Sequence, residues 1–413
     1  MSRARPAPPA LTLLAALAAG GVAAQDAPIP DALRGSVLVT DDANPPVAAT
    51  PAGAAPWPWA DADGGGVAVV LAGDTNLLRE SVEDGLDALR YVAPTLRAAD
   101  LAFLNLEAVP SGSTAQPYSE DVPHKTGWRH ARPEMAEVMA QAGVDGVGLA
   151  NNGAFPRLAT VRAMEALDAA GVGYVGAGMT DAEAREPLVF ERGGETVGFL
   201  QYTLVYWPHD QEATESLPGV ATVASDKLLR PHPRFFDRPE RGPQLVTVLD
   251  PESVDRLRAD VARLAEAADV AVVQFHWSVT GREDFPYQHE LARVVVEAGA
   301  DLVVGHGPHR LQKVETIDGV PVVHSLANFA FDWDQMDKAP EGLVARIVVR
   351  DGEIRRLSLV PVLRDAEDRP VLLDPREGYG TALYRELRAL STADLSLDGA
   401  EIVVGLPDPT ASR

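Results

Sequence analysis

Short runs of hydrophobic residues alternate with longer stretches of helical periodicity from residue 67 onward. The short runs are typical of buried strands, and their alternation with helices predicts βαβ units and a largely parallel sheet in an α/β fold. We interpret as strands the runs 67–72, 101–106, 146–150, 197–202, 271–275, 302–304, 320–324 and 343–349. Helical periods predict helices at 132–142, 159–170, 254–267 and 287–298.

Polar side chains follow many of these strands, at the point where each hydrophobic run ends. The clusters are Gly73-Asp74, Asn105-Leu106-Glu107, Asn151-Asn152, His276-Trp277, 305–309 and Asn328. Singly, each has a structural explanation, because Gly-Asp and Asn-Asn are common in turns and a lone histidine is usually a structural residue. In an open α/β sheet, however, the carboxyl ends of the strands share one edge, where ligands bind. We therefore expect the clusters to converge on one site.

The residue types in these clusters are those that hold a divalent metal ion. Carboxylate, amide oxygen and imidazole together suit a hard or borderline cation. The sequence supplies this set as Asp74, Glu107, Asn151 or Asn152, His276 and His309. The chain has no cysteine, which excludes a Cys-ligated zinc site, an iron–sulfur cluster, a cysteine nucleophile and a disulfide framework.

Charge limits the partners that the protein can bind. The 413 residues include 36 Lys+Arg and 60 Asp+Glu, which gives a formal net charge of −24. Nucleic acids and anionic lipid headgroups are disfavoured, because both repel a surface of this sign. The 46% hydrophobic content is that of a globular protein, long enough for one large α/β domain or two smaller ones.

The N-terminal residues predict an export signal. Arg3 and Arg5 precede an apolar run at 10–23 that ends in small residues, so we expect a signal peptide at 1–24 with cleavage after Ala24. A retained membrane anchor is the alternative, but the run is shorter than the roughly 20 residues that span a bilayer. We expect a soluble exported protein, periplasmic or extracellular, in which the Pro/Ala/Gly-rich residues 25–65 form a linker or arm.

The order of the polar clusters resembles the CapA family of poly-γ-glutamate capsule synthesis proteins. The motifs that carry the resemblance are Gly73-Asp74, Asn105-Leu106-Glu107, 142–145 with 149–152, 166–178, His276-Trp277, 298–312 and 325–329. They cover roughly residues 67–335. The resemblance implies a four-layer α/β/β/α sandwich of the calcineurin-like metallophosphatase type, which we place at 66–365, followed by a C-terminal extension at 366–413.

The resemblance also implies roles for individual residues. It implies a centre for divalent metal, such as Mn, Zn, Fe or Mg, with the ligands Asp74, Glu107, Asn151, His276 and His309. His306 and Asn152 are the implied catalytic residues, and His306 is also a candidate ligand.

Contacts with substrate are expected from four residues. Lys125 and Arg129 would face an anionic substrate, with solvated surface charge as the alternative. Trp277 would line a polymer groove, with core packing as the alternative, and Asn328 would contact substrate. Residues 231–243 are interpreted as an insertion loop without assigned chemistry.

One departure from the family pattern concerns the proton donor. The family's Asn-Asn-His reads Asn151-Asn152-Gly153 here, and glycine cannot donate a proton. Loss of a general acid typically costs about 10² to 10⁴ in rate. The sequence therefore leaves open a metal-dependent hydrolase or transferase of capsule synthesis and a non-catalytic polymer-binding or scaffold protein of envelope assembly. A plain phosphoesterase follows from fold analogy alone.

The expected partners follow from these alternatives. They are an anionic polymer or a small phosphorylated or glutamyl substrate, together with membrane-bound capsule synthesis machinery. Nucleic acid is not among them, because of the net negative charge.

Overall fold

The computed structural model describes residues 55–59, 65–112, 129–207, 209–277, 285–332 and 339–407. The predicted signal peptide, most of the predicted linker and Lys125 lie outside these residues, so their roles stay predictions. Among the described helices, none is long and apolar enough to cross a membrane.

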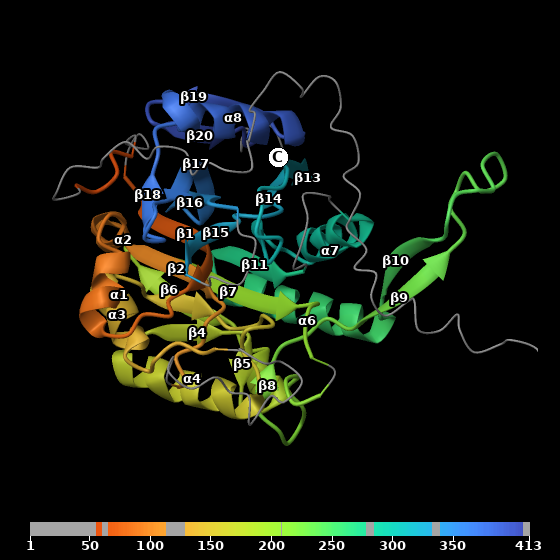
Figure 1. Cartoon of the computed structure of the whole chain (residues 1–413), viewed down its shortest axis with the longest axis horizontal. Coiled ribbons are helices and arrows are strands. Elements are labelled where there is room, and N and C mark those ends of the chain that lie inside the picture. Colours follow the sequence, from red (N-terminus) through yellow and green to blue (C-terminus); the bar gives the residue numbers. More distant parts are fainter. Residues whose placement is uncertain are drawn as a thin grey trace, which may run out of the picture. The chain divides into compact units, whose positions relative to one another are not determined.

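Ten strands form the first sheet, whose parallel half carries the predicted βαβ pattern (Figure 1). Strand β1 (Val67–Asn76) pairs in parallel with β2 (Leu101–Leu106) and β15 (Asn328–Phe331). The parallel order continues from β2 to β3 (Gly146–Gly148) and β4 (Gly173–Val175). On the other side of β1, antiparallel pairing links β16 (Glu341–Arg350), β17 (Glu353–Arg364), β18 (Pro370–Leu372), β20 (Glu401–Val404) and β19 (Leu395–Asp398).

The second sheet has six strands and a parallel centre. Its centre runs through β14 (Val320–Val323), β12 (Leu302–His306), β11 (Val270–His276) and β7 (Glu195–Thr203). Antiparallel strands β13 (Val314–Ile317) and β6 (Leu188–Arg192) form its edges. Two small ribbons complete the strands: β5 (Ala177–Gly178) with β8 (Gly219–Val220), and β9 (Ser225–Arg230) with β10 (Gln244–Leu249).

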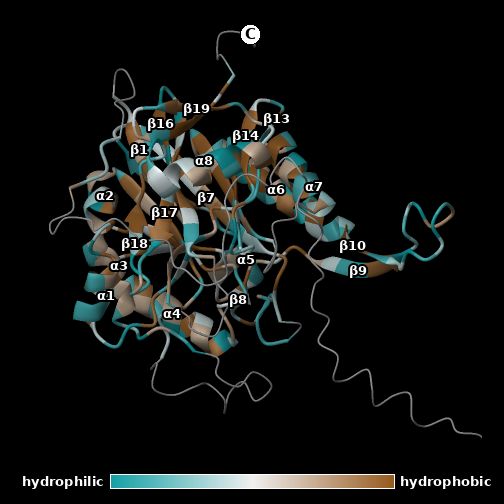
Figure 2. Cartoon of the chain, turned by 45° about the horizontal axis from the view of Figure 1, so that its top comes forward, coloured by the Kyte–Doolittle hydropathy of each residue, from teal (hydrophilic) through white to brown (hydrophobic). Residues whose placement is uncertain are grey.

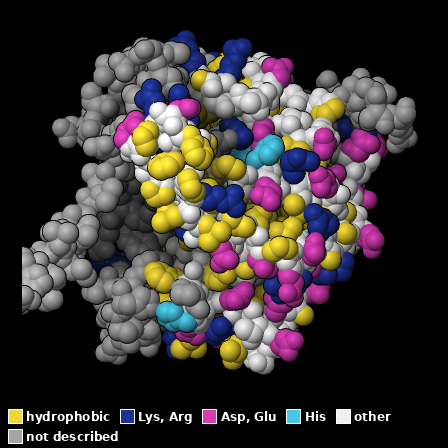
Figure 3. All heavy atoms as spheres, turned by 90° about the vertical axis from the view of Figure 1, so that its right-hand side faces the viewer, with side chains coloured by type: hydrophobic (Ala, Val, Ile, Leu, Met, Phe, Trp, Pro, Cys, Tyr) yellow, Lys and Arg dark blue, Asp and Glu magenta, His cyan; other side chains and the backbone are white. Residues whose placement is uncertain are grey.

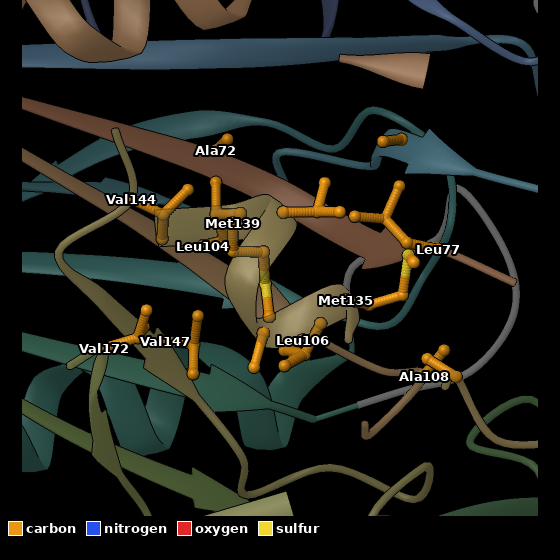
Figure 4. Packing of buried hydrophobic residues seen from close by; sticks show 14 of the residues in the cluster. Ala72, Leu77, Leu104, Leu106, Ala108, Met135, Met139, Val144, Val147 and Val172 are labelled. Carbon is orange, nitrogen blue, oxygen red and sulfur yellow. The ribbon is translucent and has the colours of Figure 1, made fainter. Parts of the chain in front are cut away.

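Helices cover the outer face of each sheet. Beside the first sheet lie α1 (Val82–Ala88), α2 (Ala93–Ala98), α3 (Met135–Ala142) and α4 (Arg157–Ala170). In Figure 4, Met135 and Met139 of α3 lie beside Leu104 and Leu106 of β2. Beside the second sheet lie α6 (Pro251–Ala267) and α7 (Pro286–Glu297). The short α5 (Asp181–Ala184) follows β5.

The two sheets pack face to face, which makes the fold a four-layer α/β/β/α sandwich. Alternate residues of β1 pack on opposite faces of the first sheet. Val70 and Ala72 belong to the core beneath the helices, and Val69 and Leu71 belong to the core between the sheets. The same inter-sheet core contains Val272 of the second sheet. Both faces of the central strands are therefore buried, which explains their unbroken hydrophobic runs. The predicted fold class is confirmed.

The residues after 365, where the sequence shows little pattern, join the first sheet. Strands β18 and β20 pair with β17, and β19 pairs with β20. Helix α8 (Gly378–Leu390) buries Leu383 and Leu387 in the same hydrophobic cluster as Leu357 and Ile402. Backbone hydrogen bonds thus attach the predicted C-terminal extension to the sheet.

Candidate metal centre

The sequence-distant polar clusters meet where the parallel strands of the two sheets end. Asp74 lies near the end of β1, Glu107 follows β2, and His309 lies in the loop after β12. His276 and His306 are the last residues of the neighbouring strands β11 and β12 and pair across them. All five side chains are buried, with exposed fractions of 0% to 9%. The predicted convergence of these five residues is therefore present in the structure.

Asp74, Glu107 and His309 form the tightest group. One ligand atom from each lies within 4.8 Å of the others. His309 connects the two carboxylates, because its Nδ1 lies 3.2 Å from Asp74 Oδ2 and its Nε2 lies 3.8 Å from Glu107 Oε2. These three residues form a possible metal-binding triad.

Two further histidines border this triad. His276 Nδ1 lies 3.4 Å from Glu107 Oε1, and His306 Nδ1 lies 3.5 Å from Asp74 Oδ1. His276 Nδ1 and Nε2, His306 Nδ1 and Glu107 Oε1 are buried and form no hydrogen bond with the part of the chain that the structure describes. Because buried polar atoms are normally satisfied, such a group of unsatisfied polar atoms fits the ligand set of a metal ion.

The electrostatics of the cluster also fit a cation. Burial raises the pKa of Glu107 to about 8, opposed by the charge of His309 and supported by that of Asp74. Burial alone would raise the pKa of Asp74 as well, but the neighbouring imidazoles of His306 and His309 hold that pKa well below its ordinary value. Two carboxyl groups in one buried site cannot both ionise cheaply without added positive charge.

The histidines respond to the same environment. Burial lowers the pKa of His276 to about 3, so its imidazole is neutral and able to act as a ligand. Burial also opposes the charge of His309, but the carboxylates of Glu107 and Asp74 outweigh it and raise the pKa of His309 to about 9. His309 thus supplies the positive charge that a divalent ion would otherwise provide. The carboxylate and imidazole donors together fit a hard or borderline divalent metal.

Buried amides orient two of the imidazoles. Gln274 Oε1 lies 2.8 Å from His306 Nε2 and can only accept, so His306 donates its Nε2–H and keeps the Nδ1 lone pair. Asn328 donates from Nδ2 to the Ala339 carbonyl and accepts at Oδ1 from His309 Nδ1, 2.8 Å away. The nitrogens left for a metal are therefore His306 Nδ1 and His309 Nε2. This geometry favours a ligand role for His306 over a proton-donor role.

A second set of amides supports Asp74. Asn105 donates to Asp74 Oδ1 at 2.8 Å, and its own Oδ1 accepts from Gln201 Nε2 at 2.8 Å. Gln201 and Gln274 are neighbours in register on β7 and β11. Sequence reasoning missed these two glutamines because each lies inside a hydrophobic run. The signal that could have found them is a lone amide in an apolar strand.

Of the Asn-Asn pair, Asn151 is hydrogen-bonded to Asn105 and to the backbone of the loops around it. Asn151 donates to the Leu106 carbonyl at 2.9 Å, and its Oδ1 accepts from the Gly153 N–H at 2.9 Å. Asn152 is half-buried, and its Oδ1 has no hydrogen-bond partner among the described residues. The ligand role of Asn151 and the catalytic role of Asn152 stay predictions.

The four predicted substrate contacts differ in their placement. Trp277 is 1% exposed, stacks on Phe275 and donates to the His324 carbonyl, so its indole packs in the core and does not offer a face to substrate. Asn328 is buried and holds His309 instead of facing solvent. Arg129 is exposed, and Lys125 lies outside the described residues.

Position 153 has no room for a side chain. A Cβ there would lie 1.7 Å from the Glu107 carbonyl oxygen and 3.0 Å from Asn151 Oδ1. The close approach of the two loops therefore requires glycine, and a histidine at this position needs a different path of the backbone. Ala327 has a φ of 55°, in the left-handed region that favours glycine.

Comparisons with known proteins agree with the motif pattern. The model of the family described as bacterial capsule synthesis protein PGA_cap matches residues 66–333. The chain is 26% identical over 291 residues to the capsule biosynthesis protein CapA of Bacillus anthracis, covering 68% of this chain and 62% of that protein. It is 34% identical over 116 residues to the PGA biosynthesis protein CapA of Bacillus subtilis (strain 168), covering 28% of this chain and 30% of that protein.

These matches span less than two thirds of the length of the two relatives. Among solved structures, a hypothetical protein from Thermus thermophilus aligns with a TM-score of 0.41 and 15% identity, over 71% of this chain and 98% of that one.

Proposed function

The chain belongs to the bacterial capsule synthesis protein family PGA_cap, within the metallophosphatase-like superfamily, and on this basis we propose that it acts in capsule synthesis. The proposed substrate is an anionic extracellular polymer such as poly-γ-glutamate, or a small glutamyl or phosphorylated precursor. The proposed chemistry is metal-dependent hydrolysis or transfer at a bond of that substrate. The family name and the names of the two relatives support the pathway, and the buried cluster supports the chemistry.

The observation that carries the proposal is the set of buried polar atoms without hydrogen bonds on Glu107, His276 and His306. The residues that would hold the metal are Asp74, Glu107, His276, His306 and His309. A divalent ion at such a site polarises a carbonyl or phosphoryl oxygen and lowers the pKa of bound water. The chain's own contribution is to keep the imidazoles neutral or oriented and to exclude bulk water through burial.

Metal content is the direct test. The protein is purified without chelators, and its Mn, Zn, Fe and Mg are measured by plasma mass spectrometry beside a His276→Ala plus His309→Ala variant. We expect about one or two equivalents in the parent and none in the variant. The matched control is His232→Ala plus His289→Ala, which removes two histidines outside the site and should retain the metal. A parent that neither contains nor takes up metal would refute the metal-dependent chemistry.

A non-catalytic polymer-binding role is the second candidate, and Gly153 is the observation that favours it. The backbone at this position has no space for the proton donor that the family pattern places there. Because Gly153→His would displace the Glu107 loop, a gain of activity cannot be sought by that substitution. The parent protein itself has to separate the two roles.

The two roles differ in what happens to the polymer. Metal-loaded protein is incubated with poly-γ-glutamate, and chain length is followed by size-exclusion chromatography with light scattering while binding is followed by equilibrium dialysis. Shortening or transfer that disappears in the His276→Ala plus His309→Ala variant supports catalysis. Binding without change in chain length, with loaded metal, supports the binding role instead.

We propose in addition that the protein is exported and works with membrane-bound capsule synthesis machinery. The basic and apolar N-terminal residues support export. Mass spectrometry of the protein from the cell exterior should find an N-terminus at Gln25. An intact Met1 in that fraction would contradict cleavage after Ala24.

A further inference from the structure

A hydrophobic and cationic hairpin projects from the sandwich. Strands β9 and β10 pair only with each other among the described strands, so both edges of the ribbon are free. Figure 1 shows the ribbon and the turn at its tip standing away from the two large sheets. Its base is fixed, because Leu249 is buried in the core beside α6 and α7 and the Ala224 N–H donates to Ser253 of α6.

Large hydrophobic side chains of this hairpin are exposed to solvent. Phe236 is 95% exposed and Leu229 69% exposed, and Figure 2 shows hydrophobic stretches along the ribbon. The other exposed members are Leu228, Phe235 and Leu245. An isolated two-stranded ribbon is at best marginally stable in water. Exposed apolar surface of this extent is typical of a site that binds a partner or a membrane.

The same segment is cationic in a strongly acidic chain. Between its ends at 225 and 249 the hairpin contains the five cations Lys227, Arg230, Arg234, Arg238 and Arg241, against Asp226, Asp237 and Glu240, a net charge of 5 − 3 = +2. All five cations are exposed, and the structure gives none of them an ion pair with a described residue. Figure 3 shows hydrophobic side chains gathered beside Lys and Arg on the side from which the ribbon projects.

The arrangement of the apolar residues distinguishes between the possible occupants. Adjacent strand residues point to opposite faces, so Leu228 and Leu229 are exposed on the two different faces of the ribbon, and Phe236 lies at the tip. A protein surface or a second copy docked on the ribbon would cover one face. The headgroup region of a bilayer would surround the whole tip, so it can cover the apolar side chains on both faces and at the tip together.

We propose that the β9–β10 hairpin anchors the protein to an anionic lipid surface. Phe235 and Phe236 enter the interface, and the flanking Arg234 and Arg238 bind lipid phosphates, which guanidinium groups recognise through paired hydrogen bonds. The projection of the hairpin matters, because the net charge of −24 on the whole chain would be repelled by the same surface. Repulsion is screened over about 8 Å at physiological salt, so an arm that holds the acidic sandwich away makes binding feasible.

Vesicle binding tests this anchor, and its outcome does not depend on the metal centre. The full protein is sedimented with vesicles of 30% phosphatidylglycerol in phosphatidylcholine and with pure phosphatidylcholine vesicles. We expect binding to the anionic vesicles only, weakened as salt is raised. Arg234→Gln plus Arg238→Gln should reduce the partition coefficient about 30-fold. Phe235→Ser plus Phe236→Ser should abolish binding.

The matched control keeps the total charge of the first variant. Arg162→Gln plus Arg388→Gln removes two exposed cations from α4 and α8, and should bind as the parent does. Equal loss in this control would show a net-charge effect and overturn the anchor. Absence of parental binding to anionic vesicles, or a dimer in analytical ultracentrifugation that the Phe235→Ser plus Phe236→Ser variant converts to a monomer, would overturn it as well.

Insertion can be measured directly because the chain contains no cysteine. Asp237→Cys, which keeps both phenylalanines, is labelled with an environment-sensitive fluorophore, and Arg388→Cys on α8 carries the same label as control. Anionic vesicles should shift the emission of the label at 237 to the blue and leave the label at 388 unchanged. No shift at 237 in vesicle-bound protein would mean that another surface binds the lipid.

Discussion

Replacement of Gln274 by leucine isolates the contribution of an orienting amide to the metal centre. In the structure, Gln274 Oε1 accepts the Nε2–H of His306 at 2.8 Å, while Gln274 Nε2 has no hydrogen-bond partner among the described residues. Leucine has a similar volume, so the change removes the acceptor without opening a large cavity. Only the fixed tautomer and ring orientation of His306 are lost.

The size of the effect follows from that geometry. Loss of a group that orients a metal-binding histidine typically reduces metal affinity 10- to 100-fold, which is about 1.4 to 2.8 kcal/mol. The free energy of unfolding of the metal-free protein should fall by only about 1 kcal/mol or less, because removal of the unpaired Gln274 Nε2 offsets part of the lost hydrogen bond. Affinity and stability should therefore separate.

Two assays check this reasoning. Calorimetric titration of Mn²⁺ or Zn²⁺ gives the dissociation constants of the parent, Gln274→Leu and Gln274→Glu, and the glutamate variant should retain affinity because it keeps an acceptor. Long-range proton–nitrogen NMR of the metal-free protein reports which nitrogen of His306 carries the proton. An unchanged affinity and an unchanged tautomer in Gln274→Leu would refute the orienting role, whereas a parent that binds no metal would instead refute the proposed function.

Three further results are expected. Gly153→Ala should lower the free energy of unfolding by about 1 to 3 kcal/mol and weaken metal binding, since its Cβ would meet the Glu107 carbonyl; denaturant titration with native-like values would contradict this. Burial lowers the pKa of His130 from 6.5 to about 3, so the unfolded chain takes up the proton first as pH falls. His130 should therefore contribute about 2 kcal/mol to the loss of stability between pH 7 and pH 5, and the drop in His130→Gln should be smaller by that amount in the same denaturant assay. Metal at 100 times its dissociation constant should raise the free energy of unfolding by about 2.7 kcal/mol, and a gain that persists in His276→Ala plus His309→Ala would place the ion elsewhere.

Much of the parallel framework was readable from local sequence. The run predicted at 101–106 is β2 itself, and the helices predicted at 159–170 and 254–267 differ from α4 and α6 only at their first residues. Gly143 and Gly171 directly follow the predicted helices 132–142 and 159–170, and they end α3 and α4 in the left-handed conformation. These features depend on burial of both sheet faces and on local backbone conformation, and both produce a recognisable pattern in consecutive residues.

Other elements have no such local pattern in the sequence. The strands β17 to β20 and helix α8 were missed because their pairing and burial depend on partners distant in the chain. The strands β9 and β10 carried no recognisable period, and only residues 231–243 between them were interpreted, as an insertion loop without assigned chemistry. The net charge of the whole chain disfavoured anionic lipids, but a sum over the chain does not show that the β9–β10 hairpin is locally cationic.

The sequence by itself determined the family, the α/β class and the residues of the cluster, because motif order and the carboxyl ends of strands are properties of the linear chain. The tertiary structure decided how these residues are used. Trp277 packs in the core, and Asn328 accepts a hydrogen bond from His309. Gln274 of one strand accepts a hydrogen bond from His306 of the neighbouring strand. The carbonyl of Glu107, 46 residues away in the chain, also leaves no room for a side chain at position 153. Contacts of this kind depend on distances between separate strands and loops, and no local pattern encodes them.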